Sequence, residues 1–211
     1  MKLHNYYRSS ASFRVRIALA LKGLTYDYVP VNLAQAQQQT RTYTTLAANK
    51  LVPLLEVDGR YLSQSLAIIE YLDETHPTPA LLPADALGRA QVRALAQSIA
   101  CEIQPLHNLR VLKYLQEELI VNEDEKTEWC RYWCLEGLRS LERQLQQLPK
   151  SLYCYGDTPT LADCCLVPQI FSARRFYVDL SGLPRTMDVF EQCMMLHAFA
   201  GSQPSACPDN E

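Results

Sequence analysis

The residues best suited to chemistry stand together near the N-terminus, where Arg8 is followed by Ser9, Ser10 and, one residue later, Ser12. They separate a short apolar run from a strongly apolar segment that ends at Gly23, a pattern that predicts a strand, a turn and a helix. A helix start offers unpaired backbone N–H groups and a partial positive charge, together worth about 0.3 to 2 kcal/mol to an anion. One serine suffices as the cap, which leaves a hydroxyl for a bound thiolate or carboxylate. On these residues alone, the simpler alternative is that all three serines are capping and turn residues.

The same predicted helix carries Arg14 and Arg16 in its first turns, where the helix dipole disfavours cations. We therefore expect acidic partners or a bound anion to offset them. The remaining residues of this helix, among them Val15, Ile17 and Leu19, leave little polar surface, so the helix should be largely buried.

Composition excludes several classes of function. The chain has 211 residues, enough for one large or two small domains, and a formal charge of −3, which argues against nucleic acid as a general partner. No window approaches the roughly 18 to 20 apolar residues of a membrane span, and the N-terminus has no long apolar stretch. The sequence thus predicts a cytoplasmic protein that neither spans a membrane nor is exported.

The eight cysteines are spread through the chain without a CxxC pair, which favours buried, reduced thiols over a disulfide framework. Cys130 and Cys134 stand four positions apart on a predicted helix, a spacing that could hold a metal. No neighbouring His or Cys pair completes a tetrahedral set, so we expect no metal site.

Four strands are predicted in the N-terminal part: residues 3–7, residues 26–31 and the two arms of a hairpin over 51–63. Two apolar runs around Asp58-Gly59, a dipeptide favoured in tight turns, indicate the hairpin.

Residues 32–49 predict a weak helix or a loop, and a further helix opens at Gln64-Ser65. It ends before a proline-rich passage over 76–83, where we place a linker. This order of strands and helices is typical of an α/β thioredoxin-like domain, assigned to residues 1–79.

From residue 85 onward the pattern is helical throughout, so residues 85–211 are predicted to form an all-α bundle. The predicted helices are 87–120 with a kink at Pro105, 124–148, one opened by a capping box of Thr160 and Asp163, and 187–199. The polar tail over 201–211 is predicted to be frayed.

These features resemble the cytosolic glutathione transferases, through Gln64-Ser65, the proline after Val52 and the motif Thr160-Leu-Ala-Asp163. The stretch from Arg8 to Leu19 is similar to the signature of the zeta class, whose enzymes include maleylacetoacetate isomerases. The resemblance runs from Leu3 to about Phe199, and further class-like segments are Ile103–Asn108, Gly156–Asp163, Leu166–Gln169 and Arg175–Leu180. It implies the glutathione transferase fold, glutathione as cofactor and a homodimer.

One position departs from the class. Zeta enzymes usually carry Ser-Ser-Cys, whereas the third position here is Ala11. The chemistry must therefore rest on the serines, and Ser9 is the closest match to the catalytic serine of the family. Free glutathione, with a thiol pKa of about 8.5, is mostly protonated at neutral pH. The resemblance implies that Ser9 stabilises its thiolate at the helix start, with Ser10 as a second donor within reach.

The resemblance also implies where the rest of the tripeptide binds. Val52 would offer its backbone N–H and C=O to the cysteinyl part, if the bond to Pro53 is cis. Ser65 and the N–H groups beside it would hold the γ-glutamyl carboxylate, with Gln64 also reaching that end. Gln38 would contact the glycyl end.

The second substrate implied by the class is a small dicarboxylate with a cis-enedione, such as maleylacetoacetate or maleylpyruvate. Arginine suits its carboxylates, and the candidates are Arg8, Arg110 and Arg175. Gln104 and Asn108 would share one helix face and contact ligand together.

Three functions remain open on the sequence: a glutathione-dependent cis–trans isomerase of aromatic catabolism, a transferase or dehalogenase of small α-halo acids, and a non-catalytic glutathione-binding protein. The non-catalytic protein is disfavoured because the chain has all four of Ser9, Ser10, Gln64 and Ser65, which a scaffold protein would need only as helix caps.

Overall fold

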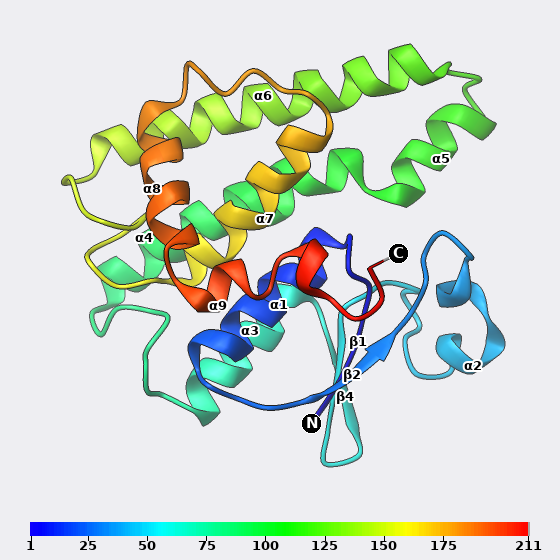
Figure 1. Ribbon diagram of the computed structural model, residues 1–211, viewed down its shortest axis with the longest axis horizontal. Coiled ribbons are helices and arrows are strands. Elements are labelled where there is room, and N and C mark those ends of the chain that lie inside the picture. The colour runs from blue at the N-terminus through cyan, green and yellow to red at the C-terminus, as the bar shows by residue number, and fades with distance from the viewer. Residues whose placement is uncertain (211) are drawn as a thin grey trace. The chain divides into compact units, whose positions relative to one another are not determined.

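A computed structural model describes residues 1–210 of the chain (Figure 1). The chain divides into two compact units, of which one is Leu82–Met194 and the other combines Met1–Leu81 with the segment from Met195 onward. The sequence placed the division at nearly the same point, between residues 79 and 85. It assigned the whole C-terminal part to the helical domain, whereas the last segment packs within the first unit.

The first unit is built on a mixed four-stranded sheet with the strand order β2-β1-β3-β4. Its strands are β1 (Lys2–Asn5), β2 (Asp27–Pro30), β3 (Leu54–Val57) and β4 (Arg60–Ser63). β1 is parallel to β2 and antiparallel to β3, with Leu3 opposite Leu55. Both leucines are fully buried, so the apolar run that predicted the first strand lies in the core.

The hairpin over β3 and β4 confirms the prediction made from Asp58-Gly59. Asp58 has a φ of 50° and Gly59 a φ of 72°, the pair of positive values that a tight two-residue hairpin turn requires. Glycine and aspartate adopt this conformation at low cost, which is why the dipeptide was informative.

Two helices of the first unit, α1 (Ser10–Leu21) and α3 (Ser65–Thr75), pack against each other. α1 is buried along most of its length, as expected, and Gly23 follows its end with a φ of 63°. Between β2 and β3 lie a short 3-10 turn, η1 (Gln37–Gln39), and a four-residue helix, α2 (Arg41–Thr44).

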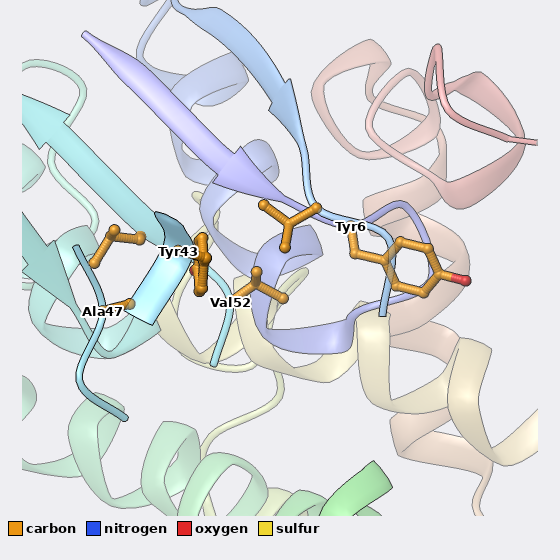
Figure 2. Packing of buried hydrophobic residues seen from close by; sticks show 6 residues of the cluster. Tyr6, Tyr43, Ala47 and Val52 are labelled. Carbon is orange, nitrogen blue, oxygen red and sulfur yellow. The ribbon is translucent and has the colours of Figure 1, made fainter. Parts of the chain in front are cut away.

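A cluster of buried apolar side chains joins this connection to the sheet (Figure 2). Its buried members are Tyr6, Val31, Tyr43, Ala47, Val52 and Leu54. The Tyr43 hydroxyl donates a hydrogen bond of 2.7 Å to the Leu51 carbonyl, so the residue before Val52 is held as well. The backbone at Val52 is therefore fixed by packing on one side and by a hydrogen bond on the other.

The prediction that the tail over 201–211 is frayed was wrong for residues 201–210, and Glu211 lies outside the described residues. Asp209 accepts hydrogen bonds from the backbone N–H of Tyr7 and from the hydroxyl of Tyr28, and the Ser202 carbonyl accepts one from Arg16. A short helix, α9 (His197–Ala200), packs against α1, and a 3-10 turn, η4 (Pro204–Ala206), follows it. These tertiary contacts order a polar segment that no local pattern would order.

The second unit is helical, as predicted. Its longer helices are α4 (Ala86–Gln97), α5 (Leu109–Glu117), α6 (Glu123–Gln147), α7 (Leu161–Arg175) and α8 (Pro184–Met194). At the start of α7, Thr160 donates from its backbone N–H and its hydroxyl to the buried carboxylate of Asp163, both at 2.7 Å. The predicted helix over 187–199 is two helices, α8 and α9.

The predicted helix over 87–120 is not one kinked helix but two α-helices separated by residues of other helical conformations. A π-helical segment, η2 (Ser98–Ile103), and a 3-10 turn, η3 (Gln104–His107), separate α4 from α5. Pro105 has no N–H to continue an α-helix. Gly137 lets this segment approach α6 closely, since a Cβ there would lie 2.3 Å from an Ile103 side-chain carbon.

No helix within residues 1–210 has the length and apolar character needed to cross a bilayer. All eight cysteines are free thiols, and each is buried except Cys101. The prediction of buried, reduced thiols therefore fits seven of the eight cysteines.

Candidate active site

Ser9 is the N-cap of α1, with extended backbone angles of −73° and 116°. Its hydroxyl oxygen accepts a hydrogen bond from the backbone N–H of Ser12 at 3.2 Å, and its own N–H donates to the Tyr6 carbonyl at 3.0 Å. The cap uses a lone pair of the hydroxyl and leaves its proton for another acceptor. Capping and anion binding, which were alternatives on the sequence, are thus compatible in one side chain.

Both Ser9 and Ser10 are half-buried, as is Ala11, and Arg8 beside them is exposed. A ligand can therefore reach both hydroxyls without unfolding the helix. Burial raises the pKa of the neighbouring Tyr6 phenol, which stays protonated at neutral pH and is unsuited to act as a base there.

Five of the buried thiols are poorly suited to the role of the cysteine that Ala11 replaces. Burial is the main cause of a raised pKa at each of five cysteines, and it takes the pKa of Cys130 to about 11 and that of Cys134 to about 12. The other three are Cys154, Cys193 and Cys207. Such thiols remain protonated and are poor nucleophiles at neutral pH.

Of the two expectations for Arg16, an acidic partner is not found among residues 1–210, and a bound anion stays a prediction. Arg16 donates to the backbone carbonyls of Ser202 and Tyr7, both at 3.1 Å, and to the side-chain oxygen of Asn5 at 3.1 Å. Neutral oxygens therefore surround this buried guanidinium. Arg14 has a different environment, because it reaches the start of α3.

Ser65 is the first residue of α3 and is 6% exposed. Nη1 of Arg14 donates to its hydroxyl oxygen at 3.2 Å. Gln64, immediately before it, is exposed and has a φ of 71° and a ψ of 113°, which an L-residue adopts at a cost of about 1 to 3 kcal/mol. Strain of this kind is concentrated at ligand sites, and here it turns the chain sharply from β4 into the N-terminus of α3.

The peptide bond between Val52 and Pro53 is cis, the condition on which the predicted backbone pairing depended. Val52 is 8% exposed and packs in the apolar cluster that contains Tyr6 (Figure 2). Among residues 1–210, no group hydrogen-bonds to its N–H or C=O. This backbone edge is therefore available for an extended peptide.

Gln38, in η1, is 7% exposed, and its side-chain oxygen has no hydrogen-bond partner within the described chain. A buried amide oxygen without a donor is costly, by about 1 to 3 kcal/mol, unless a water or ligand supplies one. The sequence suggested Gln38 only from its place in a glutamine run.

The remaining candidates lie in the second unit. Gln104 is half-buried in η3, whereas Asn108 caps α5 with extended backbone angles and accepts from the N–H of Arg110 at 3.2 Å. The prediction that Gln104 and Asn108 share one helix face was therefore wrong, because the helix breaks between them. Arg110 is exposed, and Arg175, the last residue of α7, is also exposed, with its guanidinium 4.8 Å from the Phe176 ring centroid.

The first unit thus carries six of the predicted glutathione contacts: Ser9, Ser10, Gln38, Val52, Gln64 and Ser65. Tyr6 joins two of them, because its carbonyl accepts from Ser9 and its ring packs in the cluster that holds Val52. Sequence reasoning missed the contact of Arg14 with Ser65, although the position of a cation in the first turns of α1 was a signal.

An α/β thioredoxin-like unit with a serine-capped first helix, followed in the chain by an all-helical unit, is the architecture of the glutathione transferases. Residues 1–74 match the family model for the N-terminal domain of glutathione S-transferases, and residues 134–192 match the model for their C-terminal domain.

Two curated relatives are similar over all or nearly all of their length. The maleylpyruvate isomerase of Ralstonia sp is 47% identical over 211 residues and covers 100% of both chains. The maleylacetoacetate isomerase of Mus musculus is 46% identical over 209 residues, which are 98% of this chain and 94% of the relative.

Solved structures agree with this similarity. One is described as the holo structure of a maleyl pyruvate isomerase, a bacterial glutathione transferase of the zeta class, and has a TM-score of 0.98 at 46% identity over 100% of both chains. Another, the maleylacetoacetate isomerase of Anaeromyxobacter dehalogenans with bound GSH, has a TM-score of 0.89 at 42% identity, covering 100% of this chain and 97% of its own. The chain belongs to the glutathione transferase family and, within it, to the zeta class.

Proposed function

We propose that this chain is a glutathione-dependent cis–trans isomerase of maleylacetoacetate or a related cis-enedione such as maleylpyruvate. The observation that carries the proposal is the hydroxyl of Ser9, which caps α1 through its oxygen and keeps its proton for a thiolate. The full-length similarity to isomerases of both names supports the same reaction.

Glutathione fits the polar groups of the first unit. The N-terminus of α1 and the hydroxyls of Ser9 and Ser10 face a thiolate, while the α3 N-terminus and Ser65 suit the γ-glutamyl carboxylate. The unpaired backbone edge at Val52 pairs with the cysteinyl residue, and Gln38 and Gln64 supply side-chain amides for the two ends.

The reaction needs no net transfer of atoms. The glutathione thiolate adds to the carbon–carbon double bond, whose electrons move onto the conjugated carbonyl as an enolate. The resulting single bond rotates, the enolate re-forms the double bond in the trans configuration, and the thiolate leaves. The chain has to lower the pKa of the thiol and to stabilise the enolate and the carboxylates.

Arginines and amides are the groups we assign to the second substrate. Arg8, Arg110 and Arg175 are exposed cations whose planar forks suit carboxylates, and Gln104 and Asn108 lie on the segment that precedes α5. Carboxylate ligands are present in two solved relatives: one is described with bound dicarboxyethyl glutathione and citrate in the active site, and another with bound malonate and GSH. The proposed second substrate is accordingly a small dicarboxylate.

We further propose a cytoplasmic homodimer. Eight free thiols, seven of them buried, suit a reducing compartment. Size-exclusion chromatography with light scattering should give twice the mass of the chain, and a monomer at micromolar concentration would contradict the assembly.

The deciding assay is the isomerisation of maleylacetoacetate and of maleylpyruvate, followed by absorbance with and without glutathione. We expect turnover that needs glutathione and that falls strongly in Ser9→Ala. Ser181→Ala removes an exposed serine hydroxyl and serves as the matched control, with parental kinetics expected. Turnover of an α-halo acid without isomerase activity would instead identify a dehalogenase, and glutathione binding without either reaction would identify a binding protein.

A further inference from the structure

Arg14 and Ser65 form a buried contact between the two helices that carry the proposed glutathione site. Arg14 is 2% exposed and Ser65 is 6% exposed, and Nη1 of Arg14 donates to the hydroxyl oxygen of Ser65 at 3.2 Å. Arg14 belongs to α1, which is capped by Ser9, while Ser65 opens α3. The contact therefore joins the helix assigned to the sulfur with the helix assigned to the carboxylate.

The direction of this hydrogen bond constrains what Ser65 can do. A serine hydroxyl has one proton and two lone pairs, and a guanidinium can only donate. Arg14 therefore occupies a lone pair and leaves the proton, for which residues 1–210 provide no acceptor. An anion at the start of α3 would supply that acceptor, and donation from a charged group makes the hydroxyl a stronger donor in turn.

The position of Arg14 agrees with this reading. The helix dipole does not favour a cation near the N-terminus, so the dipole of α1 does not account for Arg14. The nearby Arg16 is also buried, at 3% exposure, but its donors go to Ser202, Asn5 and Tyr7 and none goes to α3. Of these two arginines on one helix, only Arg14 contacts a residue of the proposed site.

We propose that Arg14 is a positioning residue: it orients the Ser65 hydroxyl as a donor toward the γ-glutamyl carboxylate of glutathione and so sets the affinity for that group. The inference rests on the proposed glutathione site, and it adds a residue that does not itself contact the ligand. It predicts an effect confined to one functional group of the tripeptide.

The test compares two ligands by isothermal titration calorimetry: glutathione, and the analogue in which 4-aminobutyrate replaces the γ-glutamyl residue, so that the α-carboxylate is removed and the ammonium is kept. In Arg14→Met, we expect glutathione to bind about tenfold to a hundredfold more weakly, because the loss of a hydrogen bond to a charged group lowers the affinity by about this factor. Binding of the analogue should change less than threefold. Arg14→Lys keeps the charge and one donor, and should fall between the parent and Arg14→Met.

Arg16→Met is the matched control, because it removes an equally buried arginine of the same helix. It should lower the melting temperature while leaving the ratio of the two affinities at the parental value. If Arg14→Met folds poorly, Arg14→Lys and Ser65→Ala carry the test, and in the Ser65→Ala background Arg14→Lys should have no further effect on the ratio.

Two outcomes overturn the inference. Equal weakening of both ligands in the Arg14 variants would show that Arg14 only holds the helices together. A parental protein that binds glutathione but does not distinguish it from the analogue would also overturn it, since no carboxylate site would then exist for Arg14 to support. A parent that binds neither ligand would refute the proposed function as well, and this result is distinguishable from the first two.

Discussion

The two roles assigned to Ser9 can be separated by substitution. Ser9→Ala removes the oxygen that accepts from the Ser12 N–H at 3.2 Å, and it removes the proton available to a thiolate. Loss of an N-cap costs about 1 kcal/mol, which for a chain of this length lowers the melting temperature by about 2 to 4 °C. Loss of a hydrogen bond to a charged group costs about 1.5 to 3 kcal/mol, so kcat/KM should fall by about tenfold to 150-fold.

Ser9→Asp distinguishes the two effects. Aspartate caps helices as well as serine does, and its charge at the N-terminus of α1 is favourable, so the melting temperature should equal or exceed that of the parent. Its carboxylate has no proton to donate and repels a thiolate, so activity should fall further than in Ser9→Ala. Ser9→Thr keeps both oxygen and proton and should restore much of both properties.

Thermal unfolding without glutathione and steady-state kinetics of the four proteins are the measurements. In Ser9→Asp, the melting temperature should be kept or raised while kcat/KM falls. A Ser9→Ala protein that loses stability but keeps parental kcat/KM would refute the catalytic role and leave Ser9 as a cap alone.

Three further predictions concern the framework. The Lys22 ammonium is fully buried and lies 2.8 Å from Asp73, so Lys22→Met should lower the free energy of unfolding by about 3 to 5 kcal/mol in urea titrations; a loss below about 1 kcal/mol would contradict a tight ion pair. Gly137→Ala should lower the free energy of unfolding by about 1 to 3 kcal/mol, because the added Cβ would lie 2.3 Å from an Ile103 side-chain carbon. Unchanged stability would contradict this, since the π-helical segment would then move away from α6 without cost. Burial raises the pKa of Cys134 to about 12, whereas a thiol in the unfolded chain has a pKa of about 8.5. The contribution of this protonated thiol to the free energy of unfolding is therefore complete below about pH 8.5. It declines by about 1.4 kcal/mol per pH unit as the pH rises from there toward the pKa of the folded state. Cys134→Ala should flatten the alkaline loss of stability by that slope, and an unchanged slope between pH 9 and about 11 would contradict the assignment.

The parts of the fold that were predictable are those encoded locally. Asp58-Gly59 marks the hairpin because only a few residues adopt two successive positive φ values, and Thr160 with Asp163 marks a helix start because both side chains act within one turn. Ser9 was identified for the same reason.

What could not be predicted depends on contacts between distant segments. The helical periodicity from 87 to 120 does not reveal that Ile103 packs against Gly137 and that the chain leaves the α-helix there. The ordering of the tail through Asp209 requires Tyr7 and Tyr28 from the other end of the chain.

In the candidate site too, the residues in local motifs were predictable and those that depend on distant contacts were not. The motifs identified Ser9, Val52 and Ser65, and the cis bond at Pro53 accords with the role of Val52. Periodicity placed Gln104 and Asn108 on one face, which the break before α5 separates. Arg14 was anomalous on the sequence, but its partner on α3 required the tertiary structure.

The measurement that tests the central claim most directly is the pKa of the glutathione thiol when it is bound to the protein, obtained from the ultraviolet absorbance of the thiolate as a function of pH. We expect a pKa at least one unit below the roughly 8.5 of a free thiol, and in Ser9→Ala a pKa shifted back toward 8.5 by about 1 to 2 units. A bound thiol that titrates like free glutathione, with no difference between parent and Ser9→Ala, would contradict it.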